Sequence, residues 1–279
     1  TYATLLDARG HILADLRIYC AEDHFILDVD ADLLEKALQS LSRYNIGGRT
    51  PLDPLAATAV AIQGPESRRL LEEALEIRVP VLTELSHFVT NFGAQPVRII
   101  RAGSAGEDGY EVWIESNEAT ALWDALMGCG RARGLLACGA SALETLRIEA
   151  GIPKYGFELA EDVLPLEAGL LNAISFTKGC YLGQEIVERA RSRGRVNWKL
   201  TGLWIDSSIV PARGEKALND GKEIGEITSA CLSPTLGRVI AMAYVRREVA
   251  EPGSKLTLAS GASVEVVSLP FYSRREASA

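Results

Sequence analysis

The sequence has few of the residues that most often build metal sites, disulfide frameworks or histidine-based active sites. It contains five cysteines and three histidines among 279 residues. The cysteines are odd in number, widely scattered and never spaced as Cys-x-x-Cys, so we expect neither a structural zinc site nor a disulfide framework. His11, His24 and His87 stand in unrelated contexts, which excludes a credible Ser-His-Asp triad. We therefore predict no metal ligands, and a reducing, cytoplasmic compartment fits this cysteine usage best.

Long apolar runs and excess positive charge are also missing. No apolar run approaches the ~20 residues that span a bilayer, so we expect no membrane partner. The net charge of −8 argues against general affinity for nucleic acid, and we expect none to be bound directly. Hydrophobic residues make up 47% of the chain, which is enough for a large buried core. The length favours about two domains of roughly 100–200 residues each.

The pattern of apolar residues predicts an α+β fold in the first two thirds of the chain. Strands are expected at residues 1–6, 12–19 and 24–29, and a helix follows that the carboxylate of Asp30 can cap. Further strands are expected at residues 59–63, 96–101 and 110–115, and helices at 66–75, 117–129 and 140–150. The order of strand, strand, strand and helix favours an α+β layer over a repeated β-α-β arrangement.

The composition and the hydrophobic pattern of the sequence change after about Gly194. Short β-like runs follow one another between clusters of Gly, Pro, Asn and Asp, at the spacing of strands and turns. We therefore predict a small C-terminal β-barrel or sandwich at residues 195–279, after a larger body at residues 1–194. We expect a protease to cut near this boundary, because few contacts cross a linker.

The most informative stretch is Lys178-Gly-Cys-Tyr-Leu-Gly-Gln-Glu185. Glycine lets a backbone turn sharply and lets a ligand approach closely. A cysteine close to a lysine is a candidate for a lowered thiol pKa, although a free cysteine is most often a small buried hydrophobic residue. The residues alone therefore leave two interpretations of Cys180, a reactive thiol on an exposed turn or a packing residue.

This block resembles the K-G-C-Y-x-G-Q-E signature of YgfZ-type folate-binding proteins, which are relatives of the glycine-cleavage T-protein (aminomethyltransferase). Residues 101–111, Arg-Ala-Gly-Ser-Ala-Gly-Glu-Asp-Gly-Tyr-Glu, resemble the R-T-G-Y-T-G-E-D-G-Y-E loop of T-proteins, whereas without the resemblance they indicate only a glycine-rich hairpin. Residues 141–156 resemble the T-protein stretch that ends L-R-L-E-A-G-x-x-x-Y-G. The resemblance extends from Thr1 to about Tyr272.

The resemblance implies a T-protein-like folate-binding body of mixed antiparallel sheets with helices, followed by a small C-terminal β-barrel. In this family the parts surround a central folate channel. Relatives also carry several tens of residues before the strand that opens this chain, so we expect the N-terminal part of the body to be missing. Tetrahydrofolate, or a one-carbon derivative of it, is the implied cofactor.

Three residues match positions that meet different parts of folate in T-proteins. Glu149 matches a glutamate that accepts two hydrogen bonds from the pterin edge, whereas the residue alone indicates a solvated surface carboxylate. Lys178 stands where an arginine meets the folate tail, and lysine keeps the charge but not the bidentate fork. Asp15 matches the second aspartate of G-x-x-D-D-L-x-V-Y, near folate N10 and the aminomethyl group, where it can hold or move a proton.

The resemblance assigns further residues to the cofactor and one to catalysis. Tyr19 and Asp30 match positions that face folate, although strand packing explains Tyr19 equally well. The remaining members of the signature block are also expected to bind the cofactor: Gly179, Tyr181, Gln184 and Glu185. Cys180 separates YgfZ-type proteins from T-proteins, and we expect it to be catalytic together with Asp15. A thiolate there could ligate a soft metal or accept a sulfur-linked group.

Positive charge gathers in residues 178–199, which hold six basic and two acidic residues. The arginines at positions 189, 191, 193 and 195 alternate, so on a strand they would share one face. This segment is either a solvated linker, a site for the polyglutamate tail of folate or an RNA contact. Few aromatic residues are interleaved with the arginines, so we rank the folate tail above RNA.

These observations lead to one preferred function and two alternatives. The preferred function is a tetrahydrofolate-binding accessory protein for the assembly or repair of iron–sulfur proteins, in connection with tRNA modification. Its partners would be folate and iron–sulfur proteins or their assembly machinery. The first alternative is a folate-dependent one-carbon transferase, either an aminomethyltransferase or a demethylase. The second is a folate-binding scaffold without chemistry.

Overall fold

The computed structural model describes residues 1–192, 194 and 196–272. The chain divides into two compact units that interleave along the sequence. The first unit comprises residues 1–18, 27–44 and 144–272. The second comprises residues 19–26 and 45–143. The predicted boundary near residue 194 does not coincide with this division and stays a prediction.

The first unit begins with strands and a helix. A sheet of order β1-β2-β3 contains β1 (Tyr2–Leu6), β2 (Ile12–Cys20) and β3 (Phe25–Asp28), and α1 (Leu34–Tyr44) follows it. β1 and β2 form an antiparallel hairpin. Asp30 lies at the N-cap of the short 3-10 turn that leads into α1, but its side chain makes no capping hydrogen bond. The predicted cap is therefore wrong.

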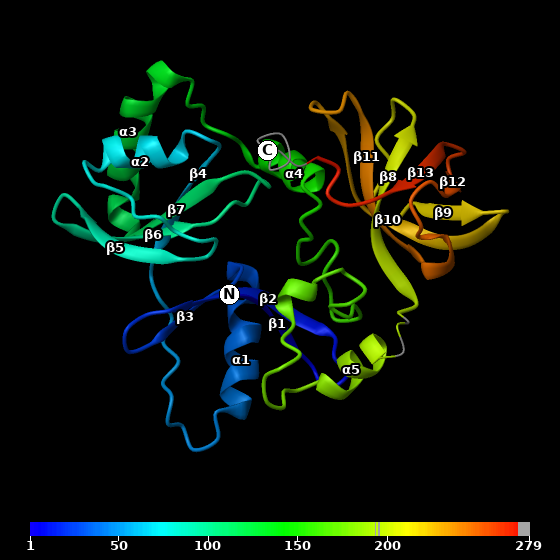
Figure 1. Ribbon diagram of the computed structural model, residues 1–279, viewed down its shortest axis with the longest axis horizontal. Helices are drawn as coiled ribbons and strands as arrows, with labels where there is room; N and C mark the ends of the chain where they lie inside the picture. The colour runs from blue at the N-terminus through cyan, green and yellow to red at the C-terminus, as the bar shows by residue number, and fades with distance from the viewer. Residues whose placement is uncertain (193, 195, 273–279) are drawn as a thin grey trace. The chain divides into compact units, whose positions relative to one another are not determined.

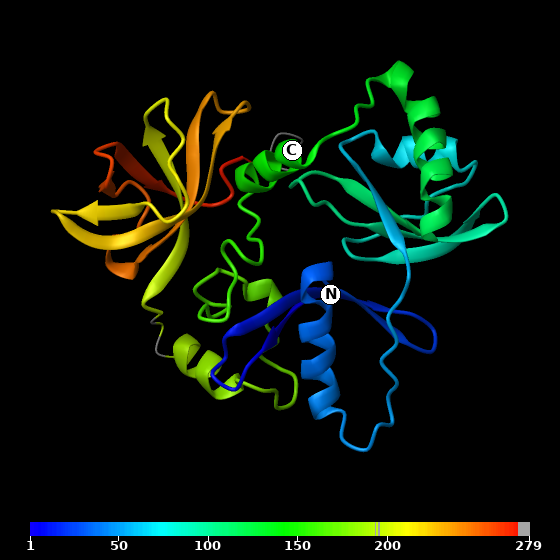
Figure 2. The same ribbon diagram turned by 180° about the vertical axis from the view of Figure 1, so that it is seen from behind.

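The C-terminal part of the first unit is a closed barrel of order β10-β11-β8-β13-β12-β9, seen from both sides in Figures 1 and 2. Its strands are β8 (Trp198–Asp206), β9 (Lys216–Asn219), β10 (Lys222–Ser233), β11 (Arg238–Arg246), β12 (Lys255–Leu258) and β13 (Ser263–Val267). Alternate residues such as Leu203 and Ile205 fill the interior. Ile240 and Met242 are buried on the other face of β11, in a cluster with Ile148 of α4 (Ala140–Glu149).

A buried guanidinium holds α4, the segment after it and the barrel together. Arg147 is only 5% exposed, and all its nitrogens donate hydrogen bonds. It binds Glu144 at 2.5 Å, Glu158 at 3.0 Å, and Ser229 of β10 at 2.7 Å, and it also donates to the backbone oxygen of Ile152 at 3.1 Å. A buried charge is tolerated only when it is paired and hydrogen-bonded, so this network fixes the C-terminal half of α4 against β10.

The second unit is a sheet covered by two helices. The sheet has the order β4-β7-β6-β5, with β4 (Thr58–Gln63), β5 (His87–Phe92), β6 (Gln95–Arg101) and β7 (Gly109–Ile114). Helices α2 (Ser67–Ala74) and α3 (Ala119–Gly130) cover one face, as Figure 1 shows, and share one core with it. The glycine-rich residues 102–108 form the expected hairpin connection between β6 and β7.

The α+β body with a C-terminal β-barrel is confirmed. Three elements were missed: β5, β9 and α5 (Gln184–Ser192). Because residues 184–192 are helical, the prediction that Arg189 and Arg191 share one face of a strand is wrong. Instead, Glu185 pairs with Arg189 at i,i+4 spacing, which stabilises a helix. Arg193 and Arg195 lie outside the described residues.

The second glycine of the signature block is needed for backbone packing. Gly183 has φ +81°, and a Cβ there would lie 2.6 Å from the Asp7 backbone oxygen and 2.7 Å from Gly10 Cα. The turn that joins β1 to β2 therefore rests directly on the chain that enters α5. Gly179, in contrast, has open space around it and no left-handed backbone. The close approach of the backbone of Asp7 and Gly10 therefore requires a glycine at position 183, whereas no such contact requires one at position 179.

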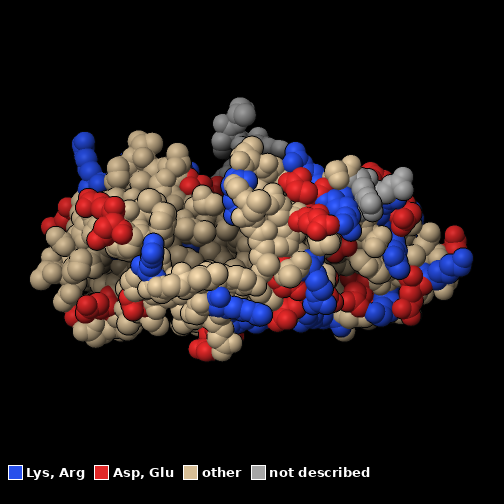
Figure 3. Space-filling model, turned by 90° about the horizontal axis from the view of Figure 1, so that it is seen from below, with Lys and Arg blue, Asp and Glu red and all other residues tan. Residues whose placement is uncertain are grey.

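None of the described helices is long and apolar enough to cross a membrane. On the face shown in Figure 3, basic and acidic side chains are interspersed rather than separated into patches. The absence of direct nucleic-acid binding stays a prediction.

We predict that Gly183→Ala lowers the free energy of unfolding by at least about 1–3 kcal/mol, the cost of a strained left-handed residue. The clash with the backbone of the β1–β2 turn adds to this cost. The matched control is Gly179→Ala in the same block, which should change stability by less than about 0.5 kcal/mol. Urea denaturation of the two variants measures the difference. Equal stability of the two proteins would contradict the assigned contact.

Candidate active site

A small pocket lies beside the β1–β2 hairpin in the first unit. It has a volume of about 110 Å³ and is lined by Tyr2, Asp15, Leu16, Arg17, Asp28, Val29 and Asp30. The antiparallel register places Thr4 opposite Asp15 and Tyr2 opposite Arg17, so residues from two strands meet at one place. The chain after β3 adds Asp30. The structure thus brings together two predicted residues, Asp15 and Asp30, with three charged or polar side chains that were not predicted.

Asp15 is a half-buried carboxylate with one side-chain hydrogen bond. Tyr2 Oη donates to Asp15 Oδ2 at 3.0 Å. Burial raises the pKa of Asp15 above its ordinary value, and the charge of Asp30 adds to the rise, whereas the hydrogen bond from Tyr2 opposes it. Burial also raises the pKa of Tyr2, and the charge of Asp15 adds to that rise, so the phenol stays a donor. The pair can therefore hold a proton at a higher pH than a solvated aspartate can.

The other two charges of the pocket compensate each other. Arg17 Nη2 lies 2.5 Å from Asp28 Oδ2 in an ion pair between β2 and β3. This pair takes up most of the positive charge of Arg17, so Arg17 lowers the pKa of Asp15 less than burial raises it. The pocket is therefore suited to proton transfer or to contact with a cationic amine, rather than to binding an anion.

We predict opposite shifts of the Asp15 pKa in two variants. Asp30→Asn removes a like charge and should lower the pKa, whereas Tyr2→Phe removes a hydrogen bond to the ionised form and should raise it. Nuclear magnetic resonance titration of the Asp15 carboxyl carbon measures both pKa values directly. Shifts of the same sign in the two variants would contradict the geometry.

Glu149 is buried at the C-terminal end of α4 and is not a solvated surface residue. It is 3% exposed, and its carboxylate accepts hydrogen bonds from the hydroxyl of Ser233 and from the backbone and hydroxyl of Thr235. The two hydroxyl donors offset the unfavourable position of a carboxylate at a helix C-terminus. A carboxylate has about four acceptor positions, and three of them are used here. A pterin edge would therefore find only one acceptor position open, and the pterin contact of Glu149 stays a prediction.

We predict that Glu149→Gln lowers the free energy of unfolding by about 1.5–3 kcal/mol, because hydrogen bonds to a charged group are lost. Thr235→Val removes one donor and should cost less, about 1 kcal/mol. Thermal or urea denaturation gives these values. Folate titration of both variants tests the pterin contact: it is wrong if Glu149→Gln binds folate as tightly as the parent chain does.

Tyr19 belongs to the second unit and packs in its core. Its ring is 1% exposed and meets His87 and Trp113 edge-on, with ring centroids 5.7 Å and 5.5 Å away. Arg98 donates to His87 Nδ1 at 2.8 Å, and burial lowers the pKa of His87. Core packing therefore accounts for Tyr19 without a ligand, and its contact with folate stays a prediction.

The signature block forms an exposed loop and the first turn of α5. Lys178 lies over the ring of Tyr181, with its ammonium 4.9 Å from the centroid, and Cys180 is exposed. Gln184 Oε1 accepts from the backbone of Tyr181 at 3.3 Å. Among the described residues, no group of three or more His, Cys, Asp or Glu side chains could hold a metal ion. Gln184 bonds to the backbone of Tyr181 and Glu185 pairs with Arg189, so both have partners that stabilise the start of α5. Their contacts with a cofactor stay predictions.

Tyr2, Arg17 and Asp28 are the pocket residues that sequence reasoning missed. Tyr2 precedes Asp15 by 13 positions, and only the strand register of the hairpin shows that they meet. The alternation of Asp15 and Arg17 along one strand was a weak signal that both share a face. Asp28 carried no signal of its own, because its partner lies on another strand.

Comparison with known proteins gives the class of this protein. Residues 1–178 match the GCVT N-terminal domain, and residues 199–273 match the glycine cleavage T-protein C-terminal barrel domain. An aminomethyltransferase of Streptomyces coelicolor is 37% identical, over 99% of this chain and 77% of the relative. An aminomethyltransferase of Moorella thermoacetica is 34% identical, over 98% of this chain and 76% of the relative.

A solved structure gives the same result. The crystal structure of glycine cleavage system aminomethyltransferase T from Bartonella henselae superposes with a TM-score of 0.89 at 26% identity, and covers 97% of this chain and 75% of that one. This chain belongs to the glycine cleavage T-protein (GCVT) family. Aminomethyltransferases of this family use tetrahydrofolate as the one-carbon acceptor, in agreement with the expected cofactor.

The comparisons overturn the preferred function. Relatives that are 30–37% identical over nearly the whole chain are named aminomethyltransferase, so the role in iron–sulfur protein assembly and tRNA modification is wrong. They also do not support the narrower resemblance to YgfZ-type proteins. That resemblance rested on one block of eight residues, and similarity over the whole length outweighs it. Iron–sulfur partners have no support either.

Proposed function

We propose that this protein is a folate-dependent aminomethyltransferase, which moves the one-carbon unit of an aminomethyl group to tetrahydrofolate. The single observation that carries this proposal is the half-buried Asp15 beside Tyr2, in a pocket of about 110 Å³. Relatives named aminomethyltransferase over nearly the full length of the chain support the reaction class. The pocket around Asp15 supports the location that we propose for the reacting groups.

Asp15 acts as the residue that holds and moves the proton. In this reaction the methylene carbon loses its bonds to the amine and to its carrier and gains bonds to two folate nitrogens. The amine and the carrier atom each gain a proton, and the two nitrogens each lose one. A carboxyl whose pKa is raised by burial can exchange a proton with a nitrogen more readily than a solvated aspartate can. Tyr2 holds Oδ2 of Asp15 in place by a hydrogen bond of 3.0 Å, which orients the carboxyl in the pocket.

The charge of the pocket suits the donor substrate. Arg17 is paired with Asp28, so Asp15 and Asp30 carry the negative charge that remains. An aminomethyl group is cationic when its amine is protonated, and two carboxylates attract it. Asp30 adds a second carboxylate to the pocket, so we propose that it strengthens binding of the cationic form of the donor.

The cofactor contacts are the remaining part of the proposal. We assign the pterin to Glu149, the tail to Lys178 and further contacts to Tyr19, Gly179, Tyr181, Gln184 and Glu185, on the matched family positions. Lys178 is exposed and rests on the ring of Tyr181, so its ammonium is available to a tail carboxylate. Cys180 is exposed as well, and the proposed reaction has no step that requires its thiol.

A scaffold without chemistry is the weaker alternative. Burial of a carboxyl with a single side-chain hydrogen bond costs stability, and such groups gather at functional sites. A protein that only binds folate gains nothing from a carboxyl whose pKa is raised by burial, whereas a protein that transfers protons needs one.

We predict that Asp15→Asn lowers aminomethyl transfer roughly 10²–10⁴-fold, the usual contribution of a general acid–base group. Its thermal stability should stay the same or rise at neutral pH. The sign follows from the raised pKa: folding favours the protonated carboxyl, so ionised Asp15 opposes folding once the pH exceeds its ordinary pKa, and asparagine removes that cost.

The glycine-cleavage half-reaction with tetrahydrofolate measures the activity, and calorimetry measures the melting temperature. Asp32→Asn is the matched control, because Asp32 is an exposed carboxylate two residues after Asp30 and does not line the pocket. The proposal fails if Asp15→Asn keeps the activity of the Asp32→Asn control.

A further inference from the structure

A second, larger pocket lies on the outer wall of the barrel, in residues that the proposed reaction does not use. Its volume is about 300 Å³, at the lower end of the range for small-molecule sites. Strands β8, β11, β12 and β13 supply its lining: Trp204, Ile205, Asp206, Arg238, Lys255, Ser263, Val264 and Glu265. Ile205 and Val264 are buried in the barrel core, so the other six residues give the pocket its chemistry.

The strand register arranges these six residues in two rows across the wall. Lys255 pairs with Glu265, and Glu265 pairs with Trp204. In the adjacent row Ser263 pairs with Asp206, and Arg238 enters β11 directly before Val239, the partner of Ile205. Because residues two apart on a strand share a face, both rows face outward.

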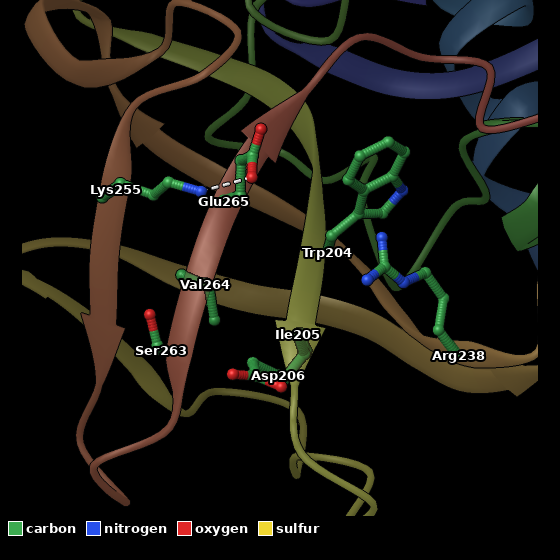
Figure 4. A pocket seen from close by; sticks show the side chains of 8 residues that line it. All are labelled: Trp204, Ile205, Asp206, Arg238, Lys255, Ser263, Val264 and Glu265. Atoms are coloured by element: carbon green, nitrogen blue, oxygen red, sulfur yellow. Dashed lines mark hydrogen bonds and ion pairs between the residues drawn. The ribbon is translucent and has the colours of Figure 1, made fainter.

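The two charges of the first row pair with each other, whereas the charges of the second row face solvent. Lys255 forms an ion pair with Glu265. The Arg238 guanidinium lies 4.6 Å from the ring centroid of Trp204. Within the described part of the chain, neither Arg238 nor Asp206 makes an ion pair, although their strands are adjacent. Figure 4 shows why: Arg238 lies on the Trp204 side of β8, and the Asp206 carboxylate points to the other side, toward Ser263.

The position of the guanidinium over the Trp204 ring favours an orientation in which its face meets the indole. A guanidinium that stacks through its face keeps the N–H donors at its edge, where they match the two oxygens of a carboxylate. Asp206 and the hydroxyl of Ser263 provide acceptors on the other side of the same strand. The pocket therefore presents one unpaired positive and one unpaired negative group, separated by more than an ion-pair distance.

We propose that this pocket is a binding site for a small zwitterion, an α-amino acid, separate from the catalytic pocket. Its carboxylate binds Arg238, and its ammonium group binds Asp206 and Ser263. Lys255 and Glu265 form the opposite wall and neutralise each other, so they do not compete for either end of the ligand. A simple anion would meet the charge of Asp206, and a simple cation would meet that of Arg238. A ligand with both charges pairs with the two exposed groups at once, which neither simple ion can do.

L-alanine is the probe that tests the charge requirement most directly. Propionate lacks its ammonium group, and ethylammonium lacks its carboxylate. We expect L-alanine to shift the indole N–H resonance of Trp204 in the full chain at millimolar concentration, and each half-molecule to bind at least tenfold more weakly. Equal binding of propionate and L-alanine overturns the proposal in favour of an anion site, and the absence of any shift of the Trp204 resonance overturns it altogether.

The barrel offers a matched control for the arginine. Arg246 lies 4.3 Å from the ring centroid of Trp198, on the same pair of strands, but does not line the pocket. Arg238→Ala should weaken L-alanine binding at least tenfold and Asp206→Asn several-fold, whereas Arg246→Ala should change it less than twofold. Equal loss in Arg238→Ala and Arg246→Ala contradicts the site. Asp15→Asn should leave L-alanine binding unchanged, so this proposal and the catalytic one can fail independently.

Discussion

The first unit depends on the complete hydrogen bonding of one buried charge. Arg147 is almost fully buried, and its guanidinium donates to Glu144, Glu158, Ser229 and one backbone oxygen. Removal of one partner from such a group typically costs several kcal/mol, because a charge would remain without compensation. The network therefore fixes α4, the segment that follows it and β10 in one arrangement. Glu149 lies two residues further along the same helix and is bonded to the same barrel.

Asp15, in contrast to Arg147, is a half-buried charged group with few partners. It has one side-chain hydrogen bond, its neighbour Arg17 is paired with Asp28, and Asp30 adds negative charge. The guanidinium of Arg147 is fully compensated, whereas burial, with the charge of Asp30, raises the pKa of the Asp15 carboxyl. The two groups therefore differ in the number of partners that face them, and the catalytic role proposed for Asp15 depends on this difference.

The signature block has structural roles at Gly183 and in the first turn of α5. Gly183 is required by the backbone of the β1–β2 turn, which also carries the strand of Asp15. Gln184 and Glu185 begin α5, and Glu185 pairs with Arg189. These contacts serve backbone packing at Gly183 and the stability of α5, and they carry no information about the reaction. The functional class came from similarity over the whole chain.

The sequence by itself determined the α+β body, the C-terminal barrel and the hairpin around residues 102–108, because these follow from local pattern and from matched motifs, and it directed attention to Asp15. It did not determine α5, because the alternation of the arginines favours a strand, whereas on a helix residues two apart do not share a face. Only the tertiary structure decided that Tyr2 bonds Asp15, that Glu149 is bonded to Ser233 and Thr235, and that Arg238 and Asp206 stay unpaired. Each of these depends on strand register or on residues far apart in sequence, and no local pattern encodes such a distance.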